Sequence, residues 1–132
     1  MNYIAIIVAA IAAFAVGALW YGPMFGKTWR GLMGVPAEGP MGSAAYSPAQ
    51  AVAMGFVATL VLCFVLGIFE GALGVSTAAG GAILAAWLWL GFVATTLASG
   101  VFYEGRPWKL YFINAFQYLA ALVVAGIIIA IW

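Results

Sequence analysis

The stretch FYEGRPWKLYFINAFQY, residues 102–118, decides how the rest of the chain is organised. It contains three charged side chains, Glu104, Arg106 and Lys109. An apolar run begins inside it and carries three polar side chains, Asn114, Gln117 and Tyr118. We interpret the stretch as a short loop from which the chain re-enters a lipid bilayer and takes polar groups in with it.

The composition indicates a membrane protein. Of the 132 residues, 68% are hydrophobic and 5% are charged, whereas a soluble domain carries about 25% charged residues. Four separate apolar runs reach the length of roughly 20 residues that a helix needs to cross a bilayer. The sequence therefore predicts an all-α membrane protein with four transmembrane helices in an antiparallel bundle, forming one domain over residues 1–132. The predicted spans are at about residues 3–22, 48–70, 77–100 and 107–131.

The scarcity of reactive side chains argues against an enzyme. The chain has no histidine, one cysteine and three acidic residues, which removes the usual haem ligand and the commonest general base. The sequence shows neither paired carboxylates nor a serine or cysteine with a nearby base, so nothing in it suggests a catalytic site. We therefore predict no catalytic residue, no metal site and no cofactor. The net charge of +1 gives no reason to expect nucleic acid as a partner.

Local signals place several helix ends. Gly22 and Pro23 are expected to end the first span, because proline disfavours helical geometry in the residue before it. Residues 47–50, SPAQ, fit a capping box with proline at the first helical position, and Ser76 can cap the third span. Residues 24–33 fit a short amphipathic helix in the head-group layer. The alternative is an irregular loop, because three glycines weaken a helix there.

Small residues recur every four positions along the first two spans, which lets helix backbones approach closely. The glycines predicted to serve helix packing are Gly17, Gly55, Gly67 and Gly71. These ridges predict helix–helix contacts and favour a homo-oligomer or a larger membrane complex.

The basic residues predict the orientation. They lie at the first and third connections, residues 23–47 and 101–106, and are Lys27, Arg30, Arg106 and Lys109. The positive-inside rule places these connections in the cytoplasm and both termini on the other side. Glu70, at the end of the second span, is expected to touch head groups or water; the alternative is a buried functional carboxylate.

Polar side chains gather in the cytoplasmic halves of the last two spans. The candidate pocket residues are Thr95, Ser99, Asn114, Gln117 and Tyr118, and the residues at its mouth are Glu104, Arg106 and Lys109. An unpaired amide in hydrocarbon is costly, so Asn114 and Gln117 should face the bundle interior. We expect them to hydrogen-bond each other, Thr95, Ser99 or Tyr118. The cluster either only holds the bundle together or forms a shallow cytoplasm-facing pocket for a small ligand or lipid head group.

The chain resembles the bacterial family called Domain of Unknown Function 1761, which consists of small four-span membrane proteins. The matching pieces are MNYIAIIVAAIAAFAVGALWYGP, then MFGKTW, then FYEGRPWKLYFINAFQYLA and the closing apolar run to Trp132. Their order and spacing carry the resemblance over nearly the whole chain. It implies the four-span topology and a bacterial inner-membrane location, and it implies no activity, substrate or cofactor.

Two classes of function remain open. The favoured hypothesis is a non-enzymatic packing or accessory membrane module that lies in the lipid bilayer and self-associates or joins a larger complex. The alternative is a small-solute permease or channel, or a binder of lipid or small ligands, that uses the cytoplasm-facing polar pocket. The non-cytoplasmic half lacks the polar groups that a continuous transport path would need, which counts against transport.

Overall fold

The structure of this chain, a computed structural model, describes residues 2–36 and 45–132. Four helical stretches in it are long and apolar enough to cross a membrane. They are Tyr3–Met24, Pro48–Leu73, Ala78–Phe102 and Trp108–Ile131. The predicted all-α membrane fold with four spanning helices is therefore confirmed.

Two of the spanning stretches contain a π-helical segment. The first consists of α1 (Tyr3–Leu19) and η1 (Trp20–Met24), and the third of α4 (Ala78–Leu88), η2 (Trp89–Ala94) and α5 (Thr95–Phe102). α3 (Pro48–Leu73) and α6 (Trp108–Ile131) are continuous. The prediction that Gly22 and Pro23 end the first span is wrong, because the helix passes both residues. Proline has no N–H to donate, and the wider turn brings the N–H of Phe25 to the Trp20 carbonyl oxygen at 2.8 Å.

The first connection contains a short helix. α2 (Gly26–Met33) confirms the predicted helix between the first two spans and excludes the irregular loop for these residues. It ends at Gly34, whose φ of 73° is the left-handed geometry that favours glycine. Residues 37–44 of the predicted connection 23–47 lie outside the described residues.

Two helix starts were predicted from side chains. The capping box of α3 is confirmed: the Ser47 hydroxyl accepts from the Gln50 N–H at 3.2 Å, and Gln50 Oε1 accepts from the Ser47 N–H at 3.0 Å. At α4 the cap is Thr77, not Ser76, and its hydroxyl oxygen accepts from the Gly80 N–H at 3.0 Å. Thr77 has the extended backbone that an N-cap needs, so the prediction was wrong by one residue.

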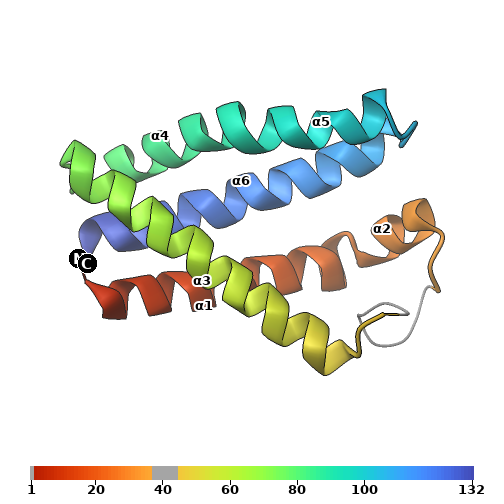
Figure 1. Cartoon of the computed structure of the whole chain (residues 1–132), viewed down its shortest axis with the longest axis horizontal. Coiled ribbons are helices and arrows are strands. Elements are labelled where there is room, and N and C mark those ends of the chain that lie inside the picture. The colour runs from red at the N-terminus through yellow and green to blue at the C-terminus, as the bar shows by residue number, and fades with distance from the viewer. Residues whose placement is uncertain (1, 37–44) are drawn as a thin grey trace.

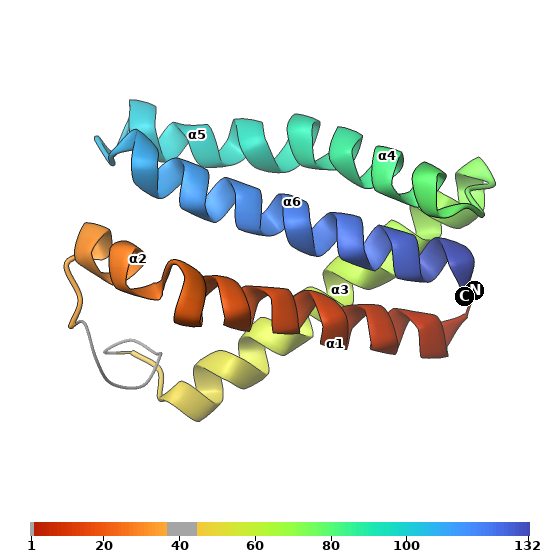
Figure 2. The same cartoon turned by 180° about the vertical axis from the view of Figure 1, so that it is seen from behind.

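Helix α6 occupies the centre of the bundle and contacts α1, α3 and α4. Both termini lie at one end, here called the terminal end (Figure 1). α2 and the turn between α5 and α6 lie at the other end, which holds all four basic residues and is called the basic end (Figure 1). α3 crosses α1 obliquely, and its first turns diverge from the other helices towards the basic end (Figure 2).

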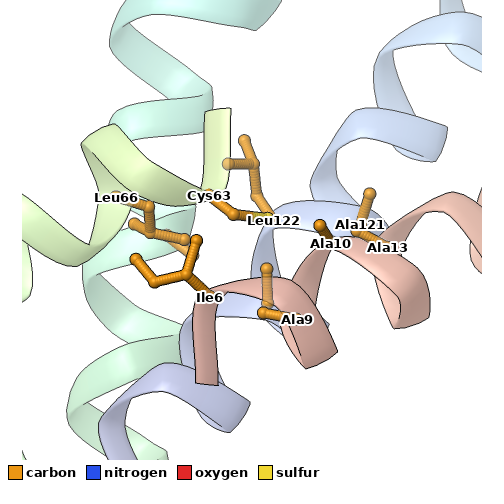
Figure 3. Packing of buried hydrophobic residues seen from close by; sticks show 10 residues of the cluster. Ile6, Ala9, Ala10, Ala13, Cys63, Leu66, Ala121 and Leu122 are labelled. Carbon is orange, nitrogen blue, oxygen red and sulfur yellow. The ribbon is translucent and has the colours of Figure 1, made fainter. Parts of the chain in front are cut away.

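The buried core lies in the halves of the helices nearer the terminal end. Mostly small side chains from α1, α3 and α6 meet there (Figure 3). The cluster consists of Ile6, Ala9, Ala10, Ala13, Cys63, Leu66, Ala85, Ala121, Leu122 and Ala125. Large exposed apolar side chains cover the outside of the bundle, as expected of helices that face lipid.

The predicted packing glycines have different surroundings. A Cβ on Gly17 would lie 3.2 Å from Gln117 Nε2, and one on Gly55 would lie 3.5 Å from the Phe14 ring. Gly67 is buried. Gly71 is exposed, and a Cβ there would meet nothing within 4 Å. The ridges of the first two spans are thus used largely inside the chain.

Candidate functional site

A cavity of about 510 Å³ lies at the basic end, against the first three turns of α6. η1 and α2 form one wall, and α5 with the turn after it forms the other. The lining residues are Tyr21, Trp29, Met33, Thr96, Leu97, Ser99, Gly100, Val101, Glu104, Arg106, Leu110, Tyr111, Asn114 and Tyr118. We call this space the basic-end cavity.

Asn114 joins α6 to the end of the first span. Its Oδ1 accepts from the Tyr21 hydroxyl at 2.8 Å and from the Trp29 indole N–H at 3.1 Å. The Tyr21 and Trp29 rings also touch edge to face, with centroids 5.5 Å apart. One residue earlier, the Ile113 carbonyl oxygen accepts from the Trp20 indole N–H at 2.9 Å. The Asn114 side chain is therefore held in one orientation at the cavity wall.

The hydroxyl groups on the other side of the cavity donate their hydrogens to backbone carbonyl oxygens. Tyr111 donates to the Ala94 carbonyl oxygen at 2.8 Å and so ties α6 to η2. Thr96 and Ser99 donate to carbonyl oxygens of their own helical stretch, each at 2.8 Å. These hydroxyl oxygens retain lone pairs, while their hydrogens are already used.

The edge of the cavity is charged and exposed. Arg106 Nε lies 3.4 Å from Glu104 Oε2, and Arg106 Nη1 donates to Met33 Sδ at 3.2 Å. Gly105, between Glu104 and Arg106 in the sequence, has a φ of 68°, which lets the turn fold back. Exposed ion pairs of this kind contribute little to stability, so the pair is free to exchange partners.

The structure brings together most of the predicted pocket residues. Ser99, Asn114, Tyr118, Glu104 and Arg106 line the cavity. The other three predicted residues do not, namely Thr95, Gln117 and Lys109.

Their positions follow from the helix faces. Thr95 is exposed and donates to the Gly91 carbonyl oxygen at 2.8 Å, and Lys109 is exposed. Gln117 is 8% exposed and packs against Gly17 at the contact between α1 and α6.

The expected partners of Asn114 were wrong. We predicted Gln117, Thr95, Ser99 or Tyr118, whereas its partners are Tyr21 and Trp29 of the first span and α2. From the sequence, no partner role was assigned to Tyr21, and Trp29 was placed only within the short amphipathic helix of residues 24–33. A topological signal for this contact was available in the sequence. The first span ends on the same side of the membrane on which the last span begins, so Tyr21 and Asn114 lie at a similar depth in the bilayer.

Glu70 lies away from this cavity, near the terminal end of α3. It is 2% exposed, which corrects the prediction that it touches head groups or water. In the described part of the chain neither carboxyl oxygen has a hydrogen-bond partner. Glu70 Oε1 lies 3.0 Å from the position that a Cβ would occupy if Gly81 carried a side chain. The buried carboxyl group therefore lies against α4.

Residues 2–36 and 45–132 contain no group of three His, Cys, Asp or Glu side chains that could hold a metal ion. What the basic-end cavity offers is aromatic surface, hydroxyl and amide groups, and one ion pair. These groups can bind and orient a molecule.

Comparison with protein families gives one finding. The model of the family DUF1761, described as "Protein of unknown function", matches residues 4–130. Comparison with curated proteins and with solved structures gives no significant match.

Proposed function

This chain belongs to the DUF1761 family of proteins of unknown function, and we propose that it binds a small amphipathic molecule in the basic-end cavity. The observation that carries the proposal is the cavity itself. Its volume of about 510 Å³ falls in the range of sites that hold small molecules, about 300–1,000 Å³. Aromatic and aliphatic side chains form most of its wall, and a few polar groups are fixed in it.

The ligand-binding function has more support than the packing module that the small-residue ridges suggested. Ala9 and Ala13 of the first ridge lie in the core, and Gly17 packs on Gln117. Since these ridges serve contacts within the chain, they give little reason to invoke a second copy. Self-association stays a prediction.

Binding also has more support than transport. The core fills the bundle between the basic-end cavity and the terminal end with small apolar side chains. A solute that crossed the membrane would need polar groups along that half. The cavity is better suited to hold a molecule that enters and leaves at the same end.

The basic end is proposed to face the cytoplasm. All four basic residues lie there, and short connections rich in lysine and arginine stay on the cytoplasmic side. The ligand would then reach the cavity from the cytoplasm or from the inner leaflet of a bacterial inner membrane.

Native mass spectrometry of the gently extracted protein tests the proposal. Ser99→Phe places a ring in the cavity lining. Thr95→Phe is the matched control, since Thr95 is also exposed on α5 and also donates its hydroxyl hydrogen to a helix carbonyl, but lies outside the lining.

We expect the wild-type chain and Thr95→Phe to retain a bound small molecule and Ser99→Phe to lose it, with equal thermal stability of the two variants. A Ser99→Phe variant that retains as much ligand as the wild type overturns the proposal. So does a wild-type chain that retains none.

A further inference from the structure

Hydrogen-bond donors without a partner remain in the basic-end cavity. Tyr21 and Trp29 donate to Asn114, and Thr96, Ser99 and Tyr111 donate to backbone carbonyl oxygens. Among the described residues this leaves the Asn114 Nδ2 hydrogens, the Tyr118 hydroxyl and part of the Arg106 guanidinium without an acceptor. A ligand with acceptor oxygens would therefore satisfy these donors.

These donors lie at different depths along α6. Arg106 precedes the helix, which begins at Trp108. At a rise of 1.5 Å per residue, Asn114 lies about 9 Å beyond Trp108, and Tyr118 lies about 6 Å further. Asn114 and Tyr118 are four residues apart and share a helix face. The order from the edge inward is thus a cation, then a neutral amide, then a neutral hydroxyl.

Taking the proposed function as its basis, we infer that the ligand is an acylglycerol phosphate of the surrounding bilayer. Its phosphate accepts from Arg106 at the cavity edge, and an ester carbonyl accepts from Asn114 Nδ2. In such a lipid an anionic phosphate, neutral ester carbonyls and apolar chains follow one another in the same order as the cavity groups. Inorganic phosphate would satisfy only the first donor, and a neutral diacylglycerol only the deeper ones.

Charge and size agree with this ligand. The described residues place four basic side chains and Glu104 at the basic end, which attracts a phosphate. Leu97, Val101 and Leu110 supply apolar contacts for the glycerol and the first methylene groups. A volume of about 510 Å³ suits a drug-sized group, so the cavity holds the head of the lipid and the chains stay in the bilayer.

The test uses the full chain in nanodiscs of neutral lipid, with phosphatidic acid, diacylglycerol and inorganic phosphate as separate probes. Native mass spectrometry measures occupancy at each concentration. Arg106→Gln removes the positive charge and most of the N–H donors of the guanidinium, and Tyr118→Phe removes a hydroxyl donor from the cavity. Lys27→Gln is the control, because it changes the net charge equally at the same end but lies outside the lining.

We expect phosphatidic acid to bind more tightly than the other two probes. Arg106→Gln should weaken it about tenfold or more, as expected for a hydrogen bond to a charged group. Tyr118→Phe should weaken it by a smaller factor, and Lys27→Gln should have an effect of less than about threefold.

Three outcomes overturn the inference: equal affinity for diacylglycerol, equal affinity for inorganic phosphate, or equal effects of Arg106→Gln and Lys27→Gln. If the retained molecule of the wild-type chain is still lost in Ser99→Phe, the proposed function stands and only the ligand class is wrong. If neither experiment detects a bound molecule, both fail.

Discussion

Gly81 of α4 and Gly126 of α6 lie backbone against backbone where the two helices pack. A Cβ on Gly126 would lie 2.7 Å from the Gly81 carbonyl oxygen, and a Cβ on Gly81 would lie 2.8 Å from the Gly126 carbonyl carbon. Real Cβ atoms essentially never come within 3.0 Å of such atoms. Small residues permit this close approach between membrane helices, and neither position accepts a side chain unless the helices move apart.

Gly126→Ala should therefore destabilise the bundle. Overpacking a close contact costs about 1–3 kcal/mol, and the better helix propensity of alanine offsets at most about 1 kcal/mol of this. Unfolding in mixed detergent, followed by circular dichroism, measures the change. Gly71→Ala is the control, because Gly71 is helical and exposed and its Cβ would meet nothing. That variant should be as stable as the wild type or more so, and equal losses in both would contradict the packing described.

Trp89 and Trp87 provide a second matched pair. The Trp89 indole N–H donates to the Ala115 carbonyl oxygen at 2.6 Å, and its ring stacks on Phe116 with centroids 5.6 Å apart. Trp87 is 67% exposed on another side of the helix. Trp89→Phe should cost about 1 kcal/mol, the usual net value of one hydrogen bond. Trp87→Phe should change stability by less than about 0.5 kcal/mol. The same unfolding assay decides, and a larger loss for Trp87→Phe would show that α4 is rotated.

The hydrogen bond between Tyr21 and Asn114 can be measured by a double-mutant cycle. Asn114→Leu should cost more than Tyr21→Phe, because it leaves the Tyr21 hydroxyl and the Trp29 indole without their acceptor. The coupling energy should be near the average of about 0.6 kcal/mol for hydrogen bonds between membrane helices. Strictly additive effects of the two substitutions would mean that the pair does not interact in the bilayer.

The spans were predictable because a bilayer demands long uncharged runs, and the described residues contain four of them. The capping box at Ser47 was also predictable, since its hydrogen bonds join residues three positions apart. Local chemistry determined these features. The passage of the first span through Pro23 was not predictable in this way, because it depends on a widened helical turn instead of on the residue types.

The candidate site was predictable only in part. Helical spacing placed Asn114 and Tyr118 on one face, and both line the cavity. The same spacing could not identify the acceptor–donor pair of Asn114 and Tyr21, which are 93 residues apart. Which helices are neighbours depends on side-chain packing over the whole bundle. That is also why Gln117 was grouped with the pocket although it packs against Gly17.

Glu70 gives the last prediction. Its carboxyl oxygens are buried and have no hydrogen-bond partner among the described residues, and a buried charge without a partner is costly. Glu70→Gln keeps the size of the side chain and cannot carry a charge. The variant should unfold at the same detergent composition as the wild type or at a more denaturing one, in neutral buffer. Glu104→Gln is the control, because Glu104 is an exposed carboxylate beside Arg106, and its loss should change stability little. If Glu70→Gln instead lost more than about 1 kcal/mol, this expectation would be contradicted, and the carboxyl group would have a hydrogen-bond donor from outside the described residues.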